Sequence, residues 1–160
     1  MKLSNRILFM ILIVGSIVVL PNILFSQIRT YHFEQVDSLQ KKQKRNIVVF
    51  IHTDWCKYCQ AMQNTTFKND SIIYKLNNEF YFIELNAEEK SQITFANHIF
   101  KYKPTGTITG IHELAEQLAT VDNKVVYPTL CFLNVDYEIV FQYNQFINSK
   151  DLQIILKRLK

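Results

Sequence analysis

The sequence predicts an α/β sandwich on a mixed central sheet, and three features support this fold class. Apolar runs of strand length recur along the chain, stretches with helical spacing of apolar residues lie between them, and a short turn joins the last two runs. The chain has 160 residues, 48% of them hydrophobic and 13% aromatic, which suits one sizeable core and is too short for two comfortable domains. We therefore expect one globular domain in which helices flank the sheet.

The first 26 residues differ from the rest of the chain. Lys2 and Arg6 form a basic start, residues 7–20 are apolar and uncharged, and the small residue Ser26 precedes Gln27. This pattern predicts a secretory signal peptide at 1–26, cleaved near Ser26. The alternative is an uncleaved anchor, because residues 7–25 approach the roughly 20 residues that span a bilayer. In both cases we expect a domain at 27–160 outside the cytoplasm, periplasmic or secreted, and membrane-bound only if the segment is retained.

Each segment of the domain has an expected structure, which follows from its apolar spacing and its turn residues. In the first half we expect a helix at residues 31–45, a strand buried on both faces at 47–51, and two further helices at 56–67 and 70–76. In the second half we expect a strand at residues 80–85, a helix at 90–100, a turn at 103–106 and a second helix at 110–119. Two antiparallel strands at 128–133 and 138–143 and a last helix at 149–159 complete the domain. Residues 101–124 form a helical insert, expected either as a lid over the site or as a cover for the sheet.

Cys56 and Cys59 form a CxxC pair that directly follows the buried strand and opens a helix. Unpaired N–H groups and the positive end of the helix dipole favour the thiolate of a cysteine in the first turn, and the charge of Lys57 acts in the same direction. Cys56 is expected to be the exposed attacking cysteine, with Cys59 one turn further in to resolve a mixed disulfide. Two alternatives stay open: an inert structural disulfide, and half of a zinc site.

The zinc alternative needs further ligands, because a structural zinc site takes four. Cys131 and one of His52, His98 or His112 are the candidates. Cys131 lies within a predicted strand, where a buried small hydrophobe is the simplest interpretation.

The segment from Trp55 to Cys59, together with Tyr127-Pro128-Thr129 at the start of a later strand, resembles the thioredoxin superfamily. It is similar to exported thioredoxin-like proteins and to the C-terminal domain of the membrane-linked disulfide reductase of bacteria. The resemblance covers residues 33–160 and implies a thioredoxin-like fold with the helical insert before the strand that opens at Pro128.

The resemblance also implies roles for individual residues. Pro128 is then the family's cis proline, facing the CxxC pair, and Trp55, Tyr127, Pro128 and Thr129 are implied to bind substrate. The family's buried acidic residue is replaced by Phe50, so proton transfer to Cys59 must use water or another group. No cofactor and no metal are implied.

Two classes of function follow. The first is a protein-disulfide oxidoreductase whose partners are proteins with thiols or disulfides, together with a membrane-embedded electron donor. The second is a binding or chaperone module that recruits extended chains without redox turnover. Nucleic acid is not expected as a partner, since removal of Lys2 and Arg6 reduces the 18 basic residues to 16, against 14 acidic ones.

Overall fold

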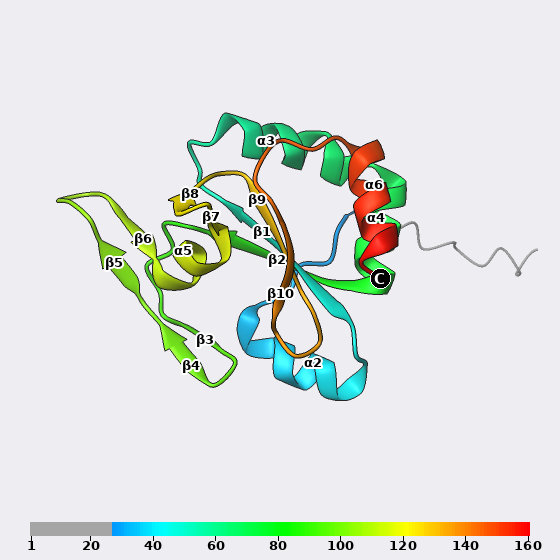
Figure 1. The fold of residues 1–160 in the computed structure, drawn as a ribbon, viewed down its shortest axis with the longest axis horizontal. Coiled ribbons are helices and arrows are strands. Elements are labelled where there is room, and N and C mark those ends of the chain that lie inside the picture. Colours follow the sequence, from blue (N-terminus) through cyan, green and yellow to red (C-terminus); the bar gives the residue numbers. More distant parts are fainter. Residues whose placement is uncertain (1–26) are drawn as a thin grey trace, which may run out of the picture.

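The computed structural model describes residues 27–160, and the predicted signal segment lies outside these described residues. The central sheet has four strands in the order β10-β9-β1-β2 (Figure 1). Their bounds are Asn46–His52 for β1, Phe80–Asn86 for β2, Thr129–Leu133 for β9 and Ile139–Tyr143 for β10. β1 is parallel to β2, whereas β9 is antiparallel to both β1 and β10, which confirms the expected mixed sheet.

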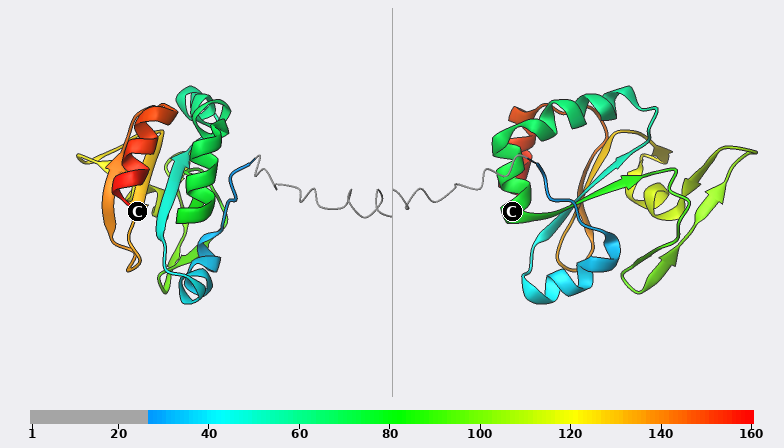
Figure 2. Two further views of the ribbon diagram at one scale, coloured as in Figure 1. Left: turned by 90° about the vertical axis from the view of Figure 1, so that its right-hand side faces the viewer. Right: turned by 180° about the vertical axis from the view of Figure 1, so that it is seen from behind.

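Helices cover both faces of this sheet (Figures 1 and 2). One face packs against the 3-10 turn η1 (Phe33–Gln35), α2 (Val36–Lys42) and α5 (Glu113–Ala119). The other face carries α3 (Lys57–Asn64), the 3-10 turn η2 (Thr66–Lys68), α4 (Asp70–Glu79) and α6 (Ser149–Arg158).

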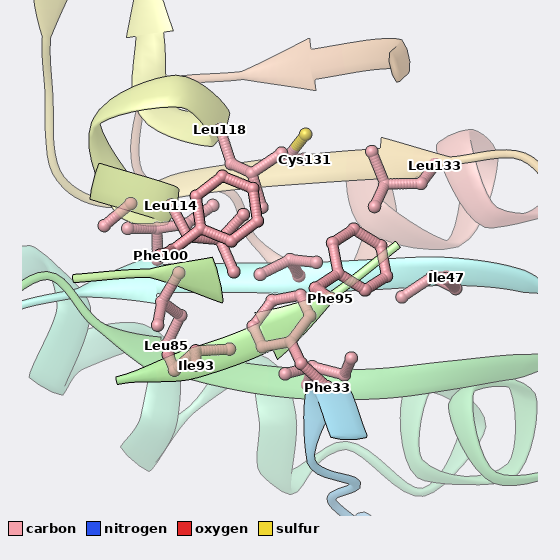
Figure 3. Close-up of a cluster of buried hydrophobic side chains, with 14 of the residues drawn as sticks. Phe33, Ile47, Leu85, Ile93, Phe95, Phe100, Leu114, Leu118, Cys131 and Leu133 are labelled. Carbon is pink, nitrogen blue, oxygen red and sulfur yellow. The ribbon is translucent and has the colours of Figure 1, made fainter. Parts of the chain in front are cut away.

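β1 separates the two hydrophobic cores. Its side chains alternate between them, with Ile47, Val49 and Ile51 in the first core and Val48 and Phe50 in the second. All five are buried, as the uninterrupted apolar run predicts for a central strand. Figure 3 shows the first core, where side chains from the strands, η1 and α5 meet. Among the described residues, the side chains that form or pack against the two cores run from Ile28 to Leu159.

The prediction of a helix at residues 90–100 is wrong. This segment forms the hairpin of β3 (Ile93–Phe95) and β4 (His98–Phe100), joined by a two-residue turn. Both turn residues are left-handed, with φ of 51° at Ala96 and 61° at Asn97, as a type I′ hairpin turn requires. Ile93, Phe95 and Phe100 point into the first core, so packing selects the strand period of two over the helical spacing that the same residues also permit.

The insert at residues 101–124 is only partly helical. It contains the hairpin of β5 (Tyr102–Pro104) and β6 (Gly110–His112), then α5, and the short pair β7 (Thr120–Val121) and β8 (Lys124–Val125). The turn and the helix expected at 103–106 and 110–119 are therefore displaced, because Lys103, Pro104 and residues 110–112 pair as strands. Leu114 and Leu118 of α5 are buried in the first core, so the helix covers the sheet, and the β5–β6 hairpin extends past it (Figure 1).

The caps of two helices differ from the residues that the sequence offers, which are Asp70 or Ser71 for α4 and Ser149 or Asp151 for α6. α4 begins after Asn69, whose Oδ1 accepts hydrogen bonds from the N–H groups of Ser71 and Ile72 at 3.1 and 3.3 Å. α6 begins after Asn148, whose Oδ1 accepts from the Asp151 N–H at 3.0 Å. Asparagine is among the best N-cap residues, so each cap lies just before the positions expected from sequence. No helix within residues 27–160 has the length and apolar character needed to cross a membrane.

Replacing the first turn residue of the β3–β4 hairpin should stabilise the protein. Ala96 is exposed and has a positive φ, a conformation that glycine adopts without the contacts of a β-carbon. We expect Ala96→Gly to raise the free energy of unfolding by about 0.5–1 kcal/mol in a urea titration. Gln117→Gly, at an exposed position inside α5, is the control and should lower it by about 1 kcal/mol. A loss of stability in Ala96→Gly would contradict the turn assignment.

Candidate functional site

Cys56 lies where the central strand β1 gives way to helix α3. It is the N-cap of α3, its N–H donates to the Thr53 carbonyl at 3.2 Å, and its Sγ accepts a hydrogen bond from the Cys59 N–H at 3.1 Å. The two cysteines form a disulfide with their Cα atoms 5.2 Å apart. A sulfur atom therefore takes the place of the oxygen that usually caps a helix N-terminus, where backbone N–H groups favour negative charge.

The two sulfur-bearing residues differ in burial. Cys59 is fully buried, and Cys56 is 6% exposed. The order agrees with the expected roles, but Cys56 is much less exposed than the sequence suggested, because the disulfide ties its side chain against the helix.

Trp55 stands beside this pair and is held from two sides. Its indole N–H donates to Glu88 Oε1 at 3.1 Å, and its ring meets the Tyr127 ring edge-on with centroids 6.1 Å apart. The side chain is nonetheless 64% exposed. The Asn86 amide reinforces the same junction by donating to Asp54 Oδ1 at 3.1 Å. The loop after β2 thus positions the residue that precedes Cys56.

A cleft of about 370 Å³ lies next to the site. It is lined by residues of three segments: Tyr58, Val126, Tyr127, Pro128, Asn144, Gln145 and Phe146. The Tyr127–Pro128 peptide bond is cis, as the resemblance implied. Antiparallel pairing of Ile51 with Thr129 brings this loop to the end of β1 from which the CxxC segment leaves.

The structure does not bring every candidate to the surface. Thr129 is fully buried and its hydroxyl donates to the Val126 carbonyl at 2.7 Å, so it supports the loop and does not line the cleft. Phe50 is buried, packs edge-on against Phe67 and stacks with His52. An aromatic ring therefore fills the place where the resemblance implies an acid.

Burial raises the pKa of the Tyr127 hydroxyl to about 12, and the negative charges of Glu88 and Glu116 add to this rise. Tyr127 is therefore neutral at physiological pH and offers the cleft an aromatic face with an uncharged hydroxyl. Sequence reasoning missed Glu88 and the cleft residues 144–146, because no pattern links them to the CxxC pair.

Cys131 lies on the opposite face of the sheet from the disulfide. It is fully buried in the first core near Leu118, whereas Cys56 and Cys59 belong to the second core (Figure 3). The sheet therefore separates Cys131 from the pair, and the zinc site considered from the sequence does not form. Within residues 27–160 no three His, Cys, Asp or Glu side chains gather in a way that would hold a metal ion.

Comparison with known families agrees with this geometry. The profile of a thioredoxin-like domain matches residues 33–160. The chain belongs to the thioredoxin-like family. The fold, with its mixed sheet and flanking helices, and the resemblance given by the CxxC and Tyr127-Pro128 segments are thereby confirmed.

Solved structures of other thioredoxin-like proteins share the fold at low sequence identity. The DsbH oxidoreductase matches with a TM-score of 0.61 and 14% identity, covering 90% of this chain and 92% of its own. A thioredoxin from Thermus thermophilus matches at 0.58 with 18% identity, covering 82% and 86%. The C-terminal domain of DsbD from Neisseria meningitidis, in its reduced form, matches at 0.54 with 13% identity, covering 79% and 92%. No curated protein sequence gives a significant match.

The thiol of Cys131 should be inert in the native thioredoxin-like domain. Burial raises its pKa to about 12, so the reactive thiolate is scarce and shielded. We expect the native disulfide form to show no reaction with Ellman's reagent, and one thiol to react after unfolding in guanidinium. Rapid modification of the folded protein would contradict this placement.

His112 links the insert to the strand end that carries the site. It is fully buried and caps α5, with Nδ1 accepting from the Leu114 N–H at 3.3 Å. The backbone N–H of His112 donates to the Ala87 carbonyl, and the backbone N–H of Ala87 donates to the His52 carbonyl. Burial lowers the pKa of the imidazole, and the nearby carboxylates of Glu89 and Glu113 only partly oppose this.

Stability should therefore decrease in mild acid. Because the neutral imidazole is favoured in the folded state, the unfolded chain binds a proton more readily, and the free energy of unfolding falls as pH drops below the unfolded pKa of roughly 6.5. His112→Asn keeps a capping oxygen and removes the titrating group. Urea titrations at pH values from about 7.5 to about 5 bracket that pKa, and we expect them to show a smaller decrease in the free energy of unfolding for the variant. Identical pH dependence in both proteins would exclude His112 as the source.

Proposed function

We propose that the protein is a thiol-disulfide oxidoreductase that acts on protein disulfides outside the cytoplasm. The observation that carries this proposal is the position of Cys56 Sγ, which caps α3, accepts the Cys59 N–H and is bonded to Cys59 itself. A sulfur so placed is favoured as a thiolate, and its partner lies within bonding distance. The thioredoxin-like fold with this CxxC pair supports the same class of chemistry.

The reaction in the reducing direction has two exchanges. The Cys56 thiolate attacks one sulfur of a substrate disulfide, which forms a mixed disulfide and releases the other sulfur as a thiolate. The Cys59 thiolate then attacks Cys56 Sγ, which closes the Cys56–Cys59 disulfide and releases the second substrate thiolate. Two electrons pass to the substrate, and each released thiolate takes a proton from water. The same steps in reverse oxidise a substrate dithiol.

A substrate chain would bind beside the disulfide. Trp55, Tyr127 and Pro128 border the pair and its cleft, and Tyr58 and Phe146 add exposed aromatic surface. Such a surface suits an extended polypeptide with an apolar residue near its cysteine more than it suits a small charged thiol. Proteins with disulfides or thiols are the proposed partners, and a membrane-embedded electron donor is the proposed source of reducing equivalents.

The proposed location rests on the sequence. Lys2, Arg6 and the apolar residues 7–20 form the start of an export signal, and the CxxC domain follows directly. An oxidising compartment also suits a protein whose cysteine pair cycles through a disulfide.

Insulin reduction with dithiothreitol as electron donor tests the proposed activity. Wild type should accelerate precipitation of the insulin chains, and Cys56→Ser should act no faster than dithiothreitol alone. Cys59→Ser should accumulate a mixed disulfide with the substrate through Cys56, visible as a shifted band on a non-reducing gel. Cys131→Ala is the matched control and should keep the activity, because Cys131 lies in the other core. Equal client binding by wild type and Cys56→Ser without reduction would favour a binding module instead.

A further inference from the structure

Five exposed basic side chains lie at the end of the molecule opposite the disulfide. This set, called the basic patch below, consists of Lys41, Lys42, Lys44, Lys157 and Arg158. Lys41 and Lys42 belong to the last turn of α2, and Lys157 and Arg158 to the last turn of α6. The Asn46 amide joins the two segments by donating to the Leu159 carbonyl at 2.7 Å. In Figures 1 and 2 the C-terminus and the end of α2 lie at the end of the sheet away from the start of α3.

The charges of the basic patch are not neutralised locally. Across the described part of the chain, none of the five side chains has a carboxylate within ion-pair distance. By contrast, the neighbouring Lys75 and Lys160 both pair with Glu79 at 3.5 Å. At the other end of the sheet, the carboxylates of Asp54 and Glu88 flank the site.

The chain enters the domain beside this patch. The side chain of the buried Asn77 donates to the Gln27 carbonyl at 3.0 Å and accepts from the Arg29 N–H at 2.7 Å. The carbonyl of Asn77 accepts from Arg45, which follows Lys44. Gln27 is thus linked through Asn77 to Arg45, three residues after the end of α2, and it follows the apolar run 7–25 by only two residues.

We propose that the basic patch binds the surface of a membrane that contains anionic phospholipids. Lysine and arginine clusters beside a membrane-entering segment are attracted by anionic headgroups, and the attraction extends over roughly 8–10 Å at physiological salt. Because the patch belongs to the folded domain, it acts after cleavage near Ser26 as well as before. β1 runs from the patch to the site for seven residues, a length of about 20 Å. The disulfide then faces away from the membrane, toward water-exposed clients.

Vesicle co-sedimentation of residues 27–160 tests this surface. The wild-type domain should bind vesicles that contain phosphatidylglycerol at least 10-fold more tightly than vesicles of phosphatidylcholine alone, and high salt should abolish the difference. Replacing all five residues of the basic patch with Gln should remove this preference. The matched control replaces five exposed lysines elsewhere with Gln, giving the same net charge: Lys68, Lys90, Lys101, Lys124 and Lys150. It should keep most of the binding.

Three results would overturn the proposal: no preference for anionic vesicles, equal losses in the patch and control variants, or tighter binding of an oligonucleotide than of the vesicles. The insulin assay separates this proposal from the proposed function. Both quintuple variants should reduce insulin at the wild-type rate, since none of their residues lines the cleft or contacts the disulfide. Circular dichroism of both variants shows whether a loss of binding reflects unfolding.

Discussion

The hydrogen bond from the Cys59 N–H to Cys56 Sγ is the interaction around which the site is built. It exists because the central strand ends at His52 and a helix begins five residues later at Lys57, leaving backbone N–H groups that need an acceptor. The sulfur of Cys56 is that acceptor. The same hydrogen bond that caps the helix also favours the thiolate form of Cys56. The start of α3 and the reactivity of Cys56 therefore depend on one contact.

The two cores fix where this helix start lies. Side chains of β1 enter both cores in alternation, so a shift of the strand by one residue would exchange the two sets between the cores and disrupt the packing of both. The antiparallel partner β9 then brings the Tyr127–Pro128 loop to the same end, and the loop after β2 brings Glu88 to Trp55. Three separate chain segments thereby surround the disulfide, whereas the opposite end carries the chain entry and the basic patch.

The sequence was informative where one local pattern dominates. The run at residues 47–51, the CxxC pair behind it and the apolar face of α6 each specify one structure, and all three are found as expected. It was ambiguous where the spacing of apolar residues fits both a helix and a strand, as in residues 93–100. There, packing into the first core, including Phe95 against Phe33, decides for the hairpin. Contacts such as Glu88 with Trp55 join residues 33 positions apart, and a single sequence carries no signal for them. The same holds for the cleft residues 144–146.

The central claim is that the Cys56–Cys59 disulfide of the folded protein exchanges reversibly with thiols. An equilibrium titration with reduced and oxidised glutathione measures this directly, and Trp55 is a suitable reporter because it is the single tryptophan and adjoins Cys56. We predict one reversible two-electron transition, with the same midpoint from both directions and far-UV circular dichroism unchanged throughout. A disulfide that resists reduction until the protein unfolds would contradict it, because the pair would then be a structural bond.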